Sequence, residues 1–180
     1  MAEALAQQQG RTVIYQQTTR DNLVSALLVE FDEVHSHAPQ QRLYQPRADL
    51  DWRAARSLVL VDDELTTGNT LHALMHKLLP HLPQLQQVVW ASLVSWLTPE
   101  RQVAFQAQVP LPLHFCPLLA GSFSFEPAPG FSVQLPAAAE LPKPRAVPTP
   151  GLRLGWTVRT PLALPPVPTL PPGPVQVIGT

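Results

Sequence analysis

The sequence predicts an α/β protein with an open, mostly parallel sheet and helices packed against it. Three observations lead to this fold class. "RSLVLVDD", residues 56–63, is a nearly continuous apolar run, as in a central strand covered on both faces. Strand-like and helix-like segments alternate from there to residue 108. Most of the 22 prolines lie after residue 126, so the first two thirds of the chain should hold the folded part.

The elements before the apolar run are a helix and one or two strands. The helix formers of "AEALAQQQG" end at Gly10, a usual helix stop. "RTVIYQQTTR", residues 11–20, predicts a strand because its centre is apolar and β-branched. Leu23–Phe31 fits a strand or a short helix, and Pro39 and Pro46 bracket an irregular segment after it.

Helices and strands alternate after the apolar run. "TLHALMHKLL", residues 70–79, places its leucines and its methionine on one helical face. "QVVWASLVSWL", residues 87–97, predicts a second buried strand. "TPERQVAFQAQ", residues 98–108, predicts a helix, with Thr98 as N-cap and Pro99 at the first helical position.

Short candidate strands follow at residues 113–119, 122–127 and 131–135, and we expect them to be antiparallel and near an edge. The domain organisation predicted from this pattern is a folded domain over residues 1–135 and a Pro-rich linker over 136–174. "PVQVIGT" would then begin a further C-terminal unit at 175–180. The chain also opens in a helix-like stretch where such a sheet normally starts with a strand, so we expect the domain to be truncated at its start.

Composition excludes several classes of function. The formal net charge is -1 and the basic residues form no stripe, so we expect no nucleic-acid partner and no anionic membrane surface. The start lacks a signal peptide, and no apolar run approaches the ~20 residues that span a bilayer. The single Cys116 excludes a disulfide framework and suits a structural thiol. These features predict a cytoplasmic protein.

The stretch "LVLVDDELTTGNT", residues 58–70, combines two kinds of binding group. Asp62 and Asp63 follow the apolar run, where carboxylates can accept hydrogen bonds from a sugar diol or hold a divalent ion through its water shell. The turn that follows brings free amides and hydroxyls to a helix N-terminus, which is an anion site by geometry and dipole. Gly68 permits the backbone bend there. The ligand implied is a ribose that carries a phosphate; the turn residues are Thr66, Thr67, Gly68, Asn69 and Thr70.

"VLVDDELTTGNT" resembles the signature of type I phosphoribosyltransferases: an apolar strand, an acidic pair, three residues, then Thr-Gly-x-Thr. The resemblance implies that Asp62 and Asp63 contact the ribose hydroxyls of phosphoribosyl pyrophosphate. It also implies that Thr66–Thr70 wraps the 5′-phosphate, with Mg²⁺ as cofactor, bound indirectly through ribose or water. The expected reaction transfers the phosphoribosyl group to an unknown base or nucleophile and releases pyrophosphate.

A second match narrows the family. "YQQTTRD" and "VEFDEVHSHAPQQRLYQP" are similar to the phosphoribosyltransferase-like proteins of bacterial tellurium-resistance and stress operons, which often carry a further C-terminal domain. The resemblance covers about Tyr15–Trp96. In that family a pyrophosphate-binding loop precedes the first helix, and its absence here puts the activity of the chain in question. Proteins of this fold often dimerise, so a homodimer is one expected assembly.

Further residues are candidates for roles in the reaction. Arg20 follows the second predicted element at the place of a basic residue that faces pyrophosphate in related enzymes, or it is a solvated arginine. His35 and His37 could donate to pyrophosphate, move a proton or ligate a metal, or could simply be loop histidines. Arg42 and Tyr44 are candidate lid contacts.

We expect structural roles for the remaining histidines and tryptophans of this region. His72 and His76, four residues apart on the predicted helix, fit a polar helix face better than a metal site. Trp90 and Trp96 are expected in the core.

Two other functions compete with this interpretation. A response-regulator receiver also carries paired acids after its first strand, but the next strand here lacks the required Asp and the Thr-Gly turn would have no role. A non-catalytic protein that binds a nucleotide or phosphoribosyl group and regulates another process remains an alternative, as does an inactive gene fragment.

Overall fold

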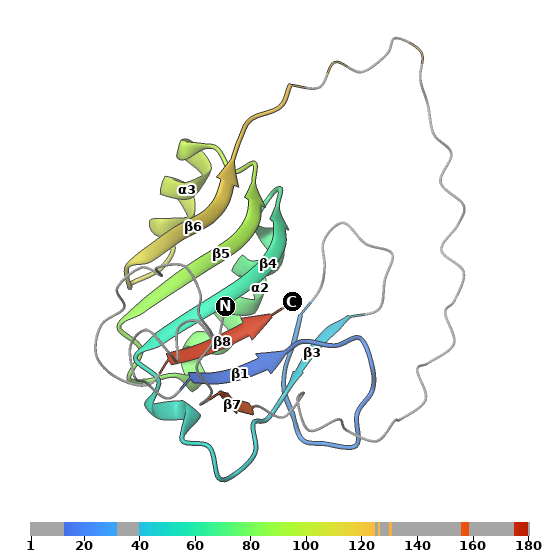
Figure 1. The fold of residues 1–180 in the computed structure, drawn as a ribbon, viewed down its shortest axis with the longest axis vertical. Coiled ribbons are helices and arrows are strands. Elements are labelled where there is room, and N and C mark those ends of the chain that lie inside the picture. The colour runs from blue at the N-terminus through green and yellow to red at the C-terminus, as the bar shows by residue number, and fades with distance from the viewer. Residues whose placement is uncertain are drawn as a thin grey trace.

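A central sheet with helices behind it forms the body of the protein (Figure 1). A computed structural model describes residues 13–31, 40–124, 126, 130, 156–158 and 175–179. In chain order the described elements are β1 (Val13–Gln17), β2 (Leu27–Phe31), β3 (Gln41–Tyr44), η1 (Trp52–Ala54), β4 (Ser57–Leu65), α2 (Asn69–Leu78), η2 (Leu79–His81), β5 (Gln87–Ser95), α3 (Pro99–Gln106), β6 (Leu113–Ala120), β7 (Trp156–Val158) and β8 (Val175–Gly179). The helix expected before Gly10 and the strand expected at 131–135 lie outside these residues.

The main sheet has six strands in the order β6-β5-β4-β8-β1-β7. The five strands from β6 to β1 run parallel, and β7 pairs antiparallel with β1 at one edge. An open, mostly parallel sheet with flanking helices is the fold class that the sequence predicts, and the structure confirms it. Among the described helices, none has the length and apolar character needed to cross a lipid bilayer.

The central strand β8 comes from the far end of the described chain. It pairs with β4 on one side and with β1 on the other, and the Thr18 amide donates to the Gly179 carbonyl at 2.9 Å. The side chains of Gln176 and Gln16 lie buried together, with Gln176 Nε2 donating to Gln16 Oε1 at 2.7 Å. We expected this segment to begin a further C-terminal unit, and that placement is corrected, since its residues complete the sheet of the first domain.

The strand β6 lies at the other edge of the sheet, as expected, but its direction differs from the prediction. It is parallel to β5, not antiparallel. The reason is the helix α3, which forms a crossover connection. It returns the chain from the carboxyl end of β5 to the edge of the sheet where β5 begins, so β6 runs parallel to β5. The strand expected at 122–127 does not form in its described residues, which are irregular.

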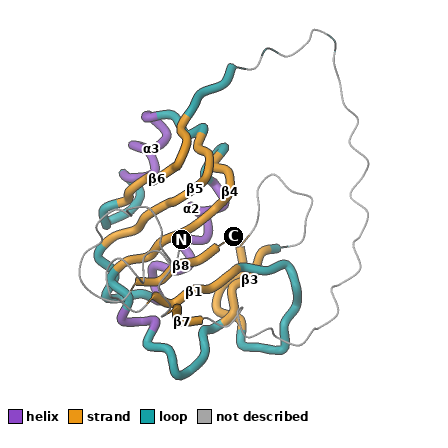
Figure 2. The backbone as a smooth tube through the Cα atoms, in the orientation of Figure 1, coloured by secondary structure: helices purple, strands orange, loops and turns teal. Residues whose placement is uncertain are grey.

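The two described α-helices cover one face of the sheet (Figure 2). α2 contributes four leucine and methionine side chains to the core on this face, and α3 contributes Phe105; they meet Leu58 and Leu60 of β4. A second, smaller apolar cluster on the opposite face includes Val59 of β4 and Val177 of β8. Residues 58–61 of β4 therefore point alternately to the helix-covered face and to the opposite face.

β2 and β3 form a separate antiparallel hairpin, which settles the choice of strand over helix for Leu27–Phe31. Val29, Phe31 and Leu43 of the hairpin belong to the same core as α2. A backbone bridge between Thr19 and Arg42 attaches the hairpin to the loop that follows β1. The hairpin is thus packed beside α2 and fastened to the end of β1.

Candidate functional site

The candidate site lies at the edge where the parallel strands end. Parallel strands share one carboxyl edge, and ligands of open α/β sheets bind there. The last described residue of β8, Gly179, pairs with Val61, while β4 continues to Leu65. The acidic pair, the Thr-Gly turn and the end of β1 therefore meet at the same edge.

The acidic pair lies inside β4 rather than after it. Asp62 pairs with Ser92 of β5, and pairing continues to Leu65, so the strand runs on past the acids instead of ending before them. Leu60 belongs to the core beneath α2 and Val61 packs on the opposite face, so strand alternation up to that point puts Asp62 on the helix-covered face. Leu65 belongs to the same core as Leu60, so alternation is interrupted between Val61 and Leu65 and does not assign a face to Asp63. Asp62 is thus the carboxylate on the side of the Thr-Gly turn.

The backbone orients both carboxylates. The Asp63 amide donates to Asp62 Oδ1 and the Glu64 amide donates to Asp63 Oδ1, each at 3.0 Å. Glu64 in turn accepts a hydrogen bond from the indole nitrogen of Trp96, Nε1 to Oε1, at 2.5 Å. Trp96, expected in the core, is only half-buried and serves this contact, while Trp90 is fully buried as expected.

Gly68 makes the turn between β4 and α2, as the sequence predicts. Its backbone is left-handed, with φ 74° and ψ 2°, and α2 begins at the next residue. A β-carbon on Gly68 would lie 2.9 Å from Phe105 Cε2 and 3.1 Å from Trp90 Cζ3. Both the backbone conformation and the packing beneath it therefore require glycine at this position.

The threonines of the turn surround the first amides of α2. Thr66 is exposed, and Thr67 and Thr70 are half-buried. The Asn69 amide donates to Thr67 Oγ1 at a long 3.4 Å. Since the amides of the first helical turn have no acceptor within the helix and lie at the positive end of its dipole, this arrangement suits an anion such as phosphate.

Arg101, which the sequence reasoning missed, reaches the turn from the first half of α3. Its Nη2 donates to Asn69 Oδ1 at 2.7 Å and its Nε donates to the Thr67 carbonyl at 3.4 Å. The side chain of Asn69 is thus engaged with Arg101. The sequence held one signal for the position of Arg101. The helix α3 follows β5, the strand next to β4 in the parallel sheet, so α3 must begin at the edge where the Thr-Gly turn lies. No spacing rule, however, identifies which residue of α3 contacts the turn.

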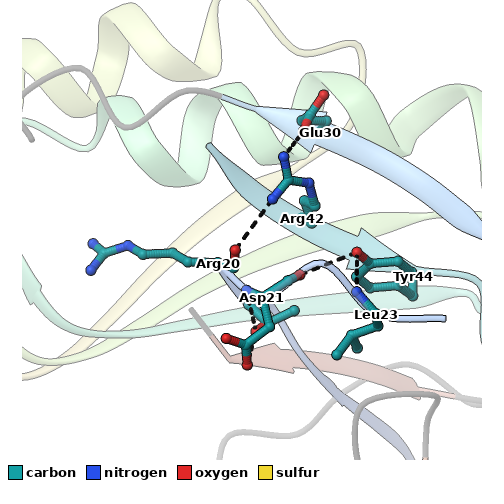
Figure 3. Close-up of polar contacts among 7 residues, drawn as sticks. Arg20, Asp21, Leu23, Glu30, Arg42 and Tyr44 are labelled. Carbon is teal, nitrogen blue, oxygen red and sulfur yellow. Dashed lines mark hydrogen bonds and ion pairs between the residues drawn. The ribbon is translucent and has the colours of Figure 1, made fainter. Parts of the chain in front are cut away.

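Arg20 also lies at the carboxyl edge, just beyond the end of β1. One strand, β8, separates β1 from β4, which places their ends roughly 10 Å apart at the usual spacing of strands. The Arg20 carbonyl accepts a hydrogen bond from Arg42 Nη1 at 3.2 Å. Figure 3 shows its side chain extending away from the cluster around Arg42 and Tyr44. Arg20 is therefore on the same edge as the acids.

Arg42 and Tyr44 hold the hairpin in place. Arg42 forms an ion pair with Glu30 at 2.8 Å, across the two strands of the hairpin. The Tyr44 hydroxyl accepts from the Leu23 amide at 2.8 Å and donates to the Asp21 carbonyl at 3.1 Å (Figure 3). These contacts give both residues a scaffolding role in the described structure, where we had considered them as lid contacts.

The histidines fall into two groups. His35 and His37 lie outside the described residues. His72 and His76 face each other on α2, with their Nε2 atoms 3.0 Å apart, and partial burial together with the charge of His76 lowers the pKa of His72. Within the described residues no group of three or more His, Cys, Asp or Glu side chains is placed to hold a metal ion.

The sequence matches a known protein family. The structure defines an open α/β protein in which an acid-bearing strand leads through a left-handed glycine into a helix, and ligands of such proteins bind at this edge. The sequence model of a family described as phosphoribosyl transferase matches residues 1–122. The match spans more than half of the chain and contains the acidic pair and the turn, so the chain belongs to the phosphoribosyl transferase family. Comparisons with curated proteins and with solved structures give no significant match.

Proposed function

We propose that this protein binds phosphoribosyl pyrophosphate with Mg²⁺ and transfers the phosphoribosyl group to an acceptor, with release of pyrophosphate. The observation that carries the proposal is that Leu58 and Leu60 of β4 lie on the face that α2 covers, so that strand alternation puts Asp62 on the side of the turn at Gly68. A carboxylate can then accept hydrogen bonds from ribose hydroxyls while the amides of the turn bind the 5′-phosphate of the same molecule. Membership of the phosphoribosyl transferase family supports this choice of ligand.

The residues at the edge fit a Mg²⁺ ion that is shared with the ligand. Mg²⁺ prefers oxygen ligands, keeps several waters and is usually held by one or two carboxylates together with phosphates of the substrate. Asp62 and Asp63 supply such carboxylates, and the described part of the chain offers no larger metal-binding group. The two aspartates would hold the ion through water or through the ribose. When bound, it would offset the negative charge of the leaving pyrophosphate.

Different groups of the protein would bind the sugar, the phosphate and the leaving group. Asp62 would fix the ribose, and the amides around Gly68 would fix the phosphate, so that the anomeric carbon is presented at the end of β8. Arg20, beyond the end of β1, would donate to the pyrophosphate and stabilise its charge as the glycosidic bond breaks. His35 and His37 remain candidates for donating to pyrophosphate or moving a proton on the acceptor.

Ligand-induced stabilisation tests the proposed binding. Phosphoribosyl pyrophosphate with Mg²⁺ should raise the melting temperature, and a ligand at 100 times its dissociation constant adds about 2.7 kcal/mol. D62N with D63N should abolish the shift while the protein stays folded. D62N alone should reduce it more than D63N, because strand alternation from Leu60 puts Asp62 on the side of the turn.

D49N is the matched control, because Asp49 is exposed and lies on the loop before β4 begins. It should leave the shift unchanged. A wild-type protein that shows no shift at millimolar ligand would refute the proposed binding, and an unchanged shift in the double variant would place the ligand elsewhere.

A turnover assay separates catalysis from binding alone. The assay measures pyrophosphate release from phosphoribosyl pyrophosphate with a panel of purine, pyrimidine and small nucleophilic acceptors. The rate of release should be lower in R20Q than in the wild type, because Arg20 would stabilise the leaving pyrophosphate. Binding without release for any acceptor would instead assign the regulatory, non-catalytic alternative.

A further inference from the structure

Arg101 links α3 to the Thr-Gly turn that precedes α2. It stands in the first half of α3, and its amide donates to Oγ1 of the N-cap residue Thr98 at 3.3 Å, so its backbone is fixed by the start of the helix. Its guanidinium contacts the turn twice, at the Asn69 side chain and at the Thr67 carbonyl. A planar guanidinium can make both contacts at once because its donors point in fixed directions.

The contact with the Thr67 carbonyl determines where the Gly68 amide points. A trans peptide is planar, and its C=O and N–H bonds point in opposite directions. The carbonyl of Thr67 points to Arg101 on α3, which lies on the β6 side of the turn. The N–H of Gly68, in the same peptide, therefore points away from Arg101 and α3. Arg20 lies on the far side of the turn from β5 and β6, beyond the end of β1.

Two residues on one face of α3, Arg101 and Phe105, pack against the turn. Phe105 stands four residues after Arg101, so both project from the same side of the helix. The Phe105 ring fills the space beneath Gly68, and the Arg101 guanidinium lies 4.7 Å from the centre of that ring. The ring thus fixes the arginine while it supports the glycine. The arginine charge stands beside the first amides of α2, where it adds to the attraction of an anion.

We propose that Arg101 is a positioning residue of the phosphate-binding turn. It holds the Thr67–Gly68 peptide in the orientation that presents the Gly68 amide to the ligand, and its charge favours a phosphate monoester at that place. This inference rests on the proposed function, since it assigns the phosphate of the same ligand to the turn.

Ribose 5-phosphate is the probe, because it carries the phosphate and the sugar without the pyrophosphate that Arg20 would bind. Binding is measured by calorimetry on the full chain for the wild type, R101Q and R101K. We expect R101Q to raise Kd by about tenfold, the loss of one charge-assisted contact. R101K should raise Kd less, by about threefold, because an ammonium keeps the charge but lacks the fixed fork.

The amide proton of Gly68 gives a readout that a general loss of stability would not move. In the wild type, ribose 5-phosphate should shift this amide signal downfield in a proton–nitrogen correlation spectrum as the hydrogen bond forms. In R101Q at saturating ligand the shift should be smaller. R53Q is the matched control, since Arg53 also lies over an aromatic ring, that of Trp52, but sits in η1 before β4 begins. It should leave both Kd and the Gly68 shift unchanged.

Each outcome separates the two proposals. A wild type that binds ribose 5-phosphate while R101Q keeps the same Kd and the same Gly68 shift would overturn the role of Arg101 and leave the proposed function intact. R101K with full wild-type affinity and shift would overturn the need for two simultaneous contacts, even if R101Q failed to fold. A wild type that does not bind ribose 5-phosphate or phosphoribosyl pyrophosphate would overturn both proposals.

Discussion

Replacing Gly68 by alanine tests the physical basis of the turn. An L-residue in the left-handed conformation, φ 74° here, costs about 1–2 kcal/mol. The new β-carbon would also lie 2.9 Å from Phe105 Cε2 and 3.1 Å from Trp90 Cζ3, and overpacking of this kind costs about 1–3 kcal/mol. We therefore expect G68A to lower the free energy of unfolding by roughly 2–5 kcal/mol, a large share of the 5–15 kcal/mol that is typical of a domain.

The assay is urea denaturation followed by tryptophan fluorescence, which is sensitive here because the fully buried Trp90 lies beneath the turn. Gly130 provides the control, because its φ is 78° but nothing lies within 4 Å of its β-carbon position. G130A should therefore show at most the conformational part of the loss. The double variant G68A with F105L should recover part of the packing term. A G68A protein within about 0.5 kcal/mol of the wild type would refute the reasoning.

Three further predictions concern stability and reactivity. T98A should destabilise the protein by about 1 kcal/mol, measured by urea denaturation, because the hydroxyl that accepts from the Arg101 amide is lost; T98S should recover most of it. Q176A should cost about 1–3 kcal/mol in the same assay, because it leaves the buried Gln16 carbonyl oxygen without its donor. Burial raises the pKa of the Cys116 thiol, so less thiolate is present at any given pH; labelling by iodoacetamide at neutral pH should be slower than for a free cysteine and should accelerate in urea. Equal labelling rates in the folded and unfolded protein would contradict the last prediction.

Local signals in the sequence were sufficient for most elements and for the turn at Gly68. The apolar run before Asp62 and the amphipathic segment after Gly68 each form the element that their periodicity predicts, and Thr98 caps α3 as its residue type suggests. Gly68 adopts the left-handed backbone conformation that glycine allows at such a bend. These features depend on neighbours in sequence, which pattern and propensity can describe.

The features that were missed depend on residues far apart in the chain. β8 enters the sheet between β4 and β1, and no local pattern indicates which gap a distant strand fills. Arg101 reaches the turn only because α3 packs beside α2. The direction of β6 was misjudged because its short, proline-containing sequence was read by itself. The predicted helix before it already implied a crossover and hence a parallel strand.

The position of β8 also has a consequence for synthesis of the protein on the ribosome. Gln16 and Gln176, which touch in the finished sheet, are 160 positions apart in the chain. While the ribosome is still making the segment between them, β4 and β1 each have an unpaired inner edge, and such edges invite pairing with other chains. Closing so long a loop is slow, and folding can finish only after Gly179 has left the exit tunnel. A nascent chain of this protein should therefore depend on chaperones until its last described strand arrives.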